Sequence, residues 1–131
     1  MLKVGTKGTK SVMVTSRNTA KTMGSGTLDV FATPALAALM EEACQTSVAG
    51  QLEPGSGTVG TLLEIRHTAP TPLGMEVSCE SVLVEADGRR LVFEVRAWDA
   101  KGSVGEGRHE RVIIREESFQ EKANAKRDTS L

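Results

Sequence analysis

The hydrophobic pattern of this chain changes from a helical to a strand-like period, and this change constrains the fold more than any other feature. Over residues 34–49 the apolar side chains recur at the spacing of one helix face, at Leu36, Leu39, Met40 and Ala43. From about residue 58 onward, apolar and polar residues alternate in four segments joined by turns, 58–68, 75–85, 91–98 and 104–115. A single amphipathic helix followed by consecutive hairpins excludes a βαβ layer fold. We therefore expect an α+β protein in which an antiparallel sheet wraps around one helix.

The two ends of the chain carry weaker signals. Residues 9–15 form a strand candidate, and residues 16–27 are polar and contain glycine, so they predict a mobile loop before the helix. From Ser118 onward the chain is charged and lacks a period, which predicts a short helix or a loose tail. We expect one domain that spans all 131 residues, with a core at about 9–116 and a tail at about 117–131.

Composition and charge argue against several classes of function. The formal net charge of −1 gives no general attraction to nucleic acid. The sequence holds no apolar run of membrane-spanning length, and its first residues lack the apolar segment of a signal peptide. We therefore expect a cytoplasmic protein that binds neither nucleic acid nor membrane. Cys44 and Cys79 are too few for a structural zinc site, so we expect two buried thiols and no metal.

The predicted helix carries the first candidate reactive groups. Thr33 followed by Pro34 predicts an N-cap and a first helical residue, because a threonine hydroxyl can accept from a free backbone N–H and proline lacks that donor. Glu41 follows two turns later at the margin of the apolar face, and no Lys or Arg lies one turn from it. Taken alone, Glu41 and Glu42 also fit a solvated helix surface, and Thr33 also fits a plain cap.

Six short motifs follow one another along the chain: Phe31-Ala32-Thr33, Leu39-Met40-Glu41, Leu52-Glu53-Pro54-Gly55, Gly60-Thr61, His67-Thr68-Ala69 and Gly107-Arg108-His109-Glu110-Arg111. Over about residues 28–120, their order, flanks and spacing resemble the hotdog-fold thioesterases, and most closely the fluoroacetyl-CoA thioesterase subfamily. The resemblance implies a hotdog fold and the hydrolysis of an acyl-CoA thioester to a free acid and the thiol of coenzyme A. Coenzyme A would enter as part of the substrate, and no cofactor is implied.

In that family a threonine at the start of the central helix, a glutamate on it and a histidine on the next strand form the catalytic group. The resemblance assigns these roles to Thr33, Glu41 and His67, and it makes Gly60 and Arg111 positions that hold the acyl-CoA. Thioester hydrolysis needs a nucleophile or a base for water, a donor for the developing oxyanion and a proton for the leaving thiolate. Glu41 would act as nucleophile or general base, His67 would polarise the substrate or move the proton, and Thr33 would orient the carboxylate or the substrate.

Plainer roles stay open for some of these residues. His67 also fits a hydrogen-bonded core histidine, Arg111 also fits a cross-strand ion pair with a carboxylate, and His109 also fits a structural role. Gly60 ends a glycine-rich run without the lysine of a P-loop, so we interpret the run as a flexible lead-in whose glycine lets a ligand approach the backbone. Two other functions stay open as well, a hotdog hydratase or dehydratase and a non-catalytic acyl-CoA-binding module.

Substrate range and assembly follow from the same resemblance. Fluoroacetyl-specific enzymes of the family carry aromatic lid residues before the helix, whereas residues 16–29 here contain none, so a broader acyl-CoA hydrolase is expected. The acyl group stays open, as does its carrier, coenzyme A or an acyl carrier protein. Because the fold leaves sheet edges that pair across a two-fold axis, we expect a homodimer, or a tetramer, with sites at the subunit boundary. Arg111 or Gly60 would then serve a site whose Glu41 belongs to the other subunit.

Overall fold

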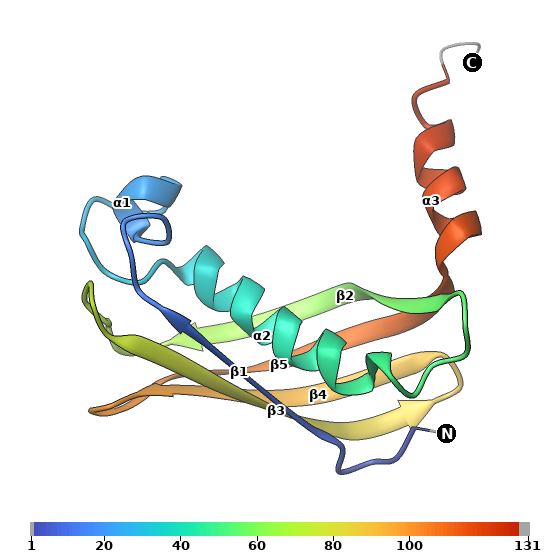
Figure 1. Cartoon of the computed structure of the whole chain (residues 1–131), viewed down its shortest axis with the longest axis horizontal. Coiled ribbons are helices and arrows are strands. Elements are labelled where there is room, and N and C mark those ends of the chain that lie inside the picture. The colour runs from blue at the N-terminus through green and yellow to red at the C-terminus, as the bar shows by residue number, and fades with distance from the viewer. Residues whose placement is uncertain (1, 129–131) are drawn as a thin grey trace.

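One curled antiparallel sheet and the long helix that it encloses make up the body of the molecule (Figure 1). The computed structural model describes residues 2–128. In chain order the elements are β1 (Lys7–Met13), α1 (Ala20–Met23), α2 (Thr33–Ala49), β2 (Ser56–His67), β3 (Glu76–Asp87), β4 (Arg90–Asp99), β5 (Gly102–Arg115) and α3 (Glu116–Ala125). Within the described part of the chain, no helix is long and apolar enough to cross a membrane. The expected α+β arrangement of one central helix and an antiparallel sheet is confirmed.

The order of the strands differs from the sequence expectation in one place. The strand order across the sheet is β1-β3-β4-β5-β2. β3, β4 and β5 follow one another through hairpins, as expected, but β2 pairs with β5 and not with the strand that follows it. Residues 68–75 therefore carry the chain from one side of the sheet toward the other. This crossing leaves β2, which is 12 residues long, as an edge strand.

The apolar side of α2 packs against the inner face of the sheet. Its buried residues include the four that the sequence predicts, and Cys44 and Val48 join them. Burial raises the pKa of both thiols to about 12, so Cys44 and Cys79 stay protonated near neutral pH and behave as core residues. The inner face of the sheet supplies much of the remaining core, chiefly Val77, Cys79, Leu83, Leu91, Phe93 and Val95.

The segment before α2 is more structured than the sequence predicts. The expected loop over 16–27 contains the short helix α1, which Thr19 caps by accepting a hydrogen bond from the Thr22 backbone N–H at 3.2 Å. Gly24 ends α1 in the left-handed region, with a φ of 75°. At the other end of the chain α3 forms the short helix that was one of two expectations, and it points away from the sheet (Figure 1). Residues 129–131 of the expected tail lie outside the described residues.

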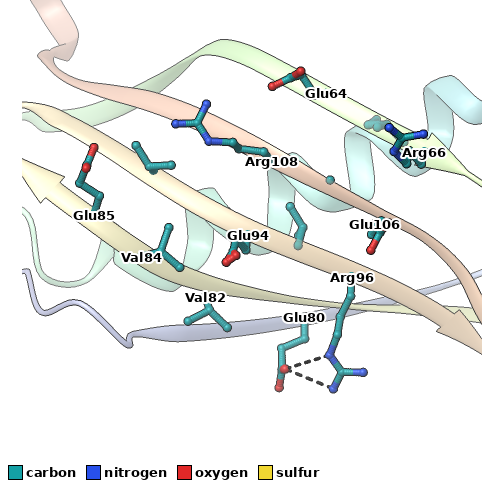
Figure 2. A pocket seen from close by; sticks show the side chains of 14 residues that line it. Glu64, Arg66, Glu80, Val82, Val84, Glu85, Glu94, Arg96, Glu106 and Arg108 are labelled. Carbon is teal, nitrogen blue, oxygen red and sulfur yellow. Dashed lines mark hydrogen bonds and ion pairs between the residues drawn. The ribbon is translucent and has the colours of Figure 1, made fainter.

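The outer face of the sheet carries charged side chains that alternate in sign from strand to strand (Figure 2). On β3, β4, β5 and β2 in that order, the residues opposite one another are Glu80, Arg96, Glu106 and Arg66. Arg96 donates to Glu80 at 3.3 and 3.4 Å, and a hollow of about 940 Å³ lies over this face. Charges of alternating sign, with an exposed ion pair such as Arg96–Glu80 among them, are typical of the solvated side of an antiparallel sheet. The functional site is therefore expected on the inner face.

Candidate active site

Thr33 lies inside the first turn of α2, where its hydroxyl meets His67 instead of capping the helix. The N-cap is Ala32, in the extended region with a φ of −75° and a ψ of 142°, and it makes no side-chain cap bond. The prediction that Thr33 is the N-cap is therefore wrong by one residue. The reason is tertiary, because the Ala32 N–H donates to Asn18 O at 2.9 Å and so fixes the backbone just before the helix. The Thr33 hydroxyl is left for another partner.

His67 ends β2 and forms a hydrogen-bonded pair with Thr33, here called the histidine pair. Its Nδ1 lies 2.8 Å from Thr33 Oγ1. Its Nε2 is buried without a hydrogen-bond partner in the described chain, and burial lowers the pKa of the ring, which favours neutral imidazole at pH 7. A buried ring nitrogen without a partner is costly unless a ligand or another chain supplies one. The pair opens onto a cavity of about 260 Å³ whose lining includes the small residues Ala20, Ser25 and Ala69.

Glu41 is half-buried on α2, whereas the adjacent Glu42 is exposed. A Cβ added to Gly60 would lie 3.0 Å from Glu41 Oε2. The same point lies 3.0 Å from His109 Cε1 and 3.5 Å from Arg111 Nη1, so three side chains converge over the bare Cα of Gly60. Among residues 2–128 no ion pair within 4.0 Å engages Glu41. Its carboxylate is available to a substrate or to water.

Arg111 is 6% exposed and stands opposite Gly60 where β5 pairs with β2. Its Nε donates to Thr58 Oγ1 and its Nη2 donates to Thr58 O, both at 2.8 Å. Its Nη1 donates to His109 Nε2 at 3.0 Å. Burial lowers the pKa of Arg111, and the nearby charge of Glu41 opposes that change. The sequence left open a cross-strand ion pair between Arg111 and a carboxylate. In the structure Arg111 instead donates to the uncharged acceptors of Thr58 and His109.

Thr58 and His109 are the residues at this site that sequence reasoning did not assign to it. Alternation along β5 already places His109 on the same face as Arg111, because the two are two positions apart. Thr58 carries no comparable signal. Its contact depends on the pairing of β2 with β5 and on a register shift between Gly60 and Leu62, neither of which the hydrophobic pattern shows.

The structure brings the expected site residues together in two groups. The histidine pair is one, and the other, here called the carboxylate cluster, consists of Glu41, Gly60 and Arg111. Gly60 and Arg111 therefore lie beside the Glu41 of their own chain, and the expectation that either would serve the Glu41 of another subunit is wrong. Thr33 and Glu41 are eight positions apart on α2, which is about 12 Å along the helix axis. Gly60 and His67 are seven positions apart on β2, which is about 23 Å of strand. The charge of Glu41 acts on the pKa of Arg111, whereas burial alone accounts for the lowered pKa of His67.

Sequence comparison establishes the family of this chain. The model of the fluoroacetyl-CoA-specific thioesterase family, FlK, matches residues 14–117. A fluoroacetyl-CoA thioesterase from Streptantibioticus cattleyicolor is 43% identical over 98 residues, which is 75% of this chain and 70% of the relative. The chain belongs to the FlK thioesterase family. The resemblance carried by the short motifs is thereby confirmed.

Solved structures of thioesterases confirm the hotdog fold. The fluoroacetyl-CoA thioesterase FlK is 36% identical to this chain with a TM-score of 0.91, over 96% of this chain and 98% of that one. A variant of FlK has also been solved in complex with acetyl-CoA. A thioesterase-superfamily protein from Thermus thermophilus is 26% identical with a TM-score of 0.88, over 96% of this chain and 93% of that one. The FlK-family chain described here therefore has the hotdog fold, an antiparallel sheet wrapped around a central helix.

Proposed function

We propose that this protein hydrolyses acyl-CoA thioesters, with the carboxylate cluster and the histidine pair as the two parts of its active site. Membership of a thioesterase family supports the reaction. The observation that carries the site assignment is the half-buried carboxylate of Glu41, which faces the bare Cα of Gly60 and has no ion-pair partner within the described residues. A glycine there leaves room for a thioester carbonyl to reach both the backbone and the carboxylate.

Hydrolysis adds one water across the C–S bond. As a general base, Glu41 takes a proton from water while the water oxygen attacks the thioester carbon. As a nucleophile, it attacks that carbon itself and water then cleaves the mixed anhydride. In both cases the C–S bond breaks, and the departing thiolate of coenzyme A takes up a proton.

The neutral imidazole of the histidine pair donates a hydrogen bond to the carbonyl oxygen, or it takes up the proton released by the attacking water and passes it to the thiolate. When His67 Nδ1 accepts the hydrogen of the Thr33 hydroxyl, Nε2 carries the ring proton, and the bond fixes the orientation of the ring. Arg111 is a second source of hydrogen-bond donors for the substrate. Thr58 and His109 accept from three of its five N–H groups. Its two remaining donors make no bond within residues 2–128 and can hold the carbonyl oxygen or a phosphate of coenzyme A.

The two parts of the site meet when β2 pairs with β2 of a second copy. β2 is an edge strand of 12 residues that contains no Lys or Pro, and a long edge without such residues favours strand pairing. The bulge between Gly60 and Leu62 leaves Gly60 and His67 six ladder steps apart on one face of β2, so in an antiparallel pair centred on Glu64 and its copy, Gly60 of one chain stands opposite His67 of the partner subunit. A homodimer of this kind has two composite sites, each with the carboxylate cluster of one subunit and the histidine pair of the other. It also offers a partner to the buried Nε2 of His67.

Mixing two inactive variants tests the composite site. Glu41→Gln disables the carboxylate cluster and His67→Ala disables the histidine pair. If each site draws on two chains, a heterodimer of the two variants has one intact site, and random subunit exchange restores about one quarter of the wild-type turnover per subunit. Heterodimers purified through a different affinity tag on each chain should reach about one half. If each site lies within one chain, the mixture stays as inactive as the separate variants.

A panel of acyl-CoA thioesters distinguishes hydrolysis from the two other candidate functions. We expect release of free thiol, measured with a thiol-reactive dye, and we expect Glu41→Gln to abolish most of it. A change in the acyl group without free thiol would instead indicate a hydratase or dehydratase. Tight binding without any turnover would indicate an acyl-CoA-binding module.

The cavity beside the histidine pair supports acyl groups of short to medium length. Its volume of about 260 Å³ is slightly below the range of about 300–1,000 Å³ that is typical of ligand pockets in proteins. Ala20 and Ser25, from the segment around α1, form part of its lining, and no aromatic residue occurs in residues 16–29. Phe31 lies in the lining, but no ring from residues 16–29 closes over the acyl group beside it, so the protein should accept acyl groups larger than fluoroacetyl.

A further inference from the structure

His109 is buried, and its two neighbours determine its protonation state. It is 1% exposed. Its Nδ1 lies 2.8 Å from Leu62 O, and because a carbonyl oxygen can only accept, Nδ1 carries the ring hydrogen. Its Nε2 lies 3.0 Å from Arg111 Nη1, and because a guanidinium can only donate, Nε2 carries none. The ring is therefore neutral and presents a lone pair to the arginine.

A bulge in β2 makes this arrangement possible. The register of β2 against β5 shifts between Gly60 and Leu62, which interrupts the ladder of backbone hydrogen bonds at that point. The Leu62 carbonyl accepts from His109 there. Without that carbonyl, one ring nitrogen of a buried histidine would lack a partner. The same bulge thus lies next to Gly60 and orients the imidazole that contacts Arg111.

Thr58 holds the other side of the guanidinium. Gly60 stands directly opposite Arg111, and Thr58 lies two residues before Gly60 on the same strand face, within reach of a long side chain. The Thr58 hydroxyl and carbonyl each accept from the guanidinium at 2.8 Å. None of the three acceptors around Arg111 is a carboxylate, so the residues that hold the guanidinium do not neutralise its charge.

We infer that His109 and Thr58 form a neutral clamp that positions Arg111, so that its full charge faces Glu41 and the thioester. The inference deepens the proposed function and rests on it, since it concerns how the carboxylate cluster is held. A carboxylate in the place of either residue would pair with Arg111 and draw it away from the substrate. His109 and Thr58 act through Arg111 and are positioning residues.

Two matched pairs of variants separate the clamp from simple packing. His109→Gln keeps an amide oxygen near the Nε2 position as an acceptor for Arg111, whereas His109→Asn reaches only the Nδ1 position and removes that acceptor. Thr58→Ser keeps the hydroxyl acceptor, whereas Thr58→Val keeps the shape of threonine without it. All four are compared with the wild type by circular dichroism, thermal unfolding and steady-state kinetics of thiol release.

Loss of the acceptor should lower catalytic efficiency in each pair. We expect His109→Asn and Thr58→Val to lower kcat/KM by about tenfold or more, the scale of a lost hydrogen bond to a charged group, chiefly through a higher KM. His109→Gln and Thr58→Ser should recover most of that loss. In an Arg111→Ala background, His109→Asn should change kcat/KM by less than about twofold, because the residue through which it acts is gone.

Three results would overturn the clamp. These are equal losses within each matched pair, a full effect of His109→Asn in the Arg111→Ala background, and a loss of activity that follows the unfolded fraction. If His109→Asn does not fold, the comparison of Thr58→Ser with Thr58→Val provides the same test, because Thr58 is only half-buried. If the wild-type protein releases thiol from no acyl-CoA, the proposed function fails. The clamp is then tested by the affinity of the variants for a non-hydrolysable acyl-CoA thioether, where equal affinities overturn it and the same ranking supports it.

Discussion

Gly60→Ala tests the active site sharply, because one methyl group reaches two of its other side chains. The new Cβ would lie 3.0 Å from both Glu41 Oε2 and His109 Cε1. Contacts of 3.0 Å are tighter than the separation of about 3.5–4.0 Å at which non-bonded heavy atoms pack best, so these neighbours have to move by a few tenths of an ångström. A misplacement of about 1 Å in a catalytic group can lower the rate by about a hundredfold. We therefore expect kcat/KM for thiol release to fall by about ten- to a hundredfold.

The free energy of unfolding should change much less than the activity. Replacing glycine by alanine stabilises by about 0.4–1 kcal/mol through the unfolded chain, and overpacking destabilises by about 1–3 kcal/mol. The net destabilisation of Gly60→Ala is then at most about 2.5 kcal/mol, which lowers the Tm of a domain of this size by roughly 10 °C or less. Provided the wild-type Tm lies well above the assay temperature, a loss of activity at 25 °C reports on the site itself.

Gly57→Ala is the matched control on the same strand. Its Cβ would lie 2.9 Å from Glu116 Oε2 and 3.1 Å from Glu116 Cδ and Cγ, all in one exposed side chain that can turn away. We expect this variant to keep kcat/KM within about twofold of the wild type, since it lies outside the carboxylate cluster. A folded Gly60→Ala protein with wild-type kcat/KM, or equal losses in the two variants, would refute the placement of the substrate over Gly60.

Three further predictions follow. Glu41→Gln should lower turnover by about a hundredfold or more with the fold intact, whereas Glu42→Gln should change turnover by less than about twofold. Equal losses in the two variants, or unfolding of Glu41→Gln seen by circular dichroism, would show that the role of Glu41 is structural. Burial lowers the pKa of His109 from 6.5, so the unfolded chain binds more protons than the folded chain as the pH falls. The free energy of unfolding should therefore decrease below about pH 6.5, and His109→Gln should lessen that decrease in urea titrations at several pH values; an identical decrease in both proteins would contradict this. Because residues 16–29 lack aromatic side chains, kcat/KM for short to medium or aryl acyl-CoAs should equal or exceed that for fluoroacetyl-CoA. A preference for fluoroacetyl-CoA over acetyl-CoA above about a thousandfold exceeds what apolar contacts provide and would show that another segment closes the pocket.

The local elements and the family could be predicted from the sequence because their signals lie in neighbouring residues. The helical period identifies the buried face of α2, and alternation places His109 and Arg111 on one face of β5. The order of the short motifs was enough to indicate the thioesterase family and the hotdog fold. The same motifs single out Thr33, Glu41 and His67, whose catalytic roles stay predictions.

Only the tertiary structure decides how these residues are grouped. Ala32 rather than Thr33 occupies the N-cap position of α2, because the Ala32 backbone N–H is hydrogen-bonded to the Asn18 carbonyl in the segment around α1. Thr58 reaches Arg111 because β2 pairs with β5 across a bulge, and strand order and register depend on contacts between residues far apart in sequence. For the same reason the sequence alone does not separate the carboxylate cluster from the histidine pair. The distance of about 12 Å between Thr33 and Glu41 follows from their spacing on one helix. The packing of helix and sheet decides that Thr33 meets His67 while Glu41 meets Gly60 and Arg111, and this grouping is why a second copy of the chain is proposed to complete the site.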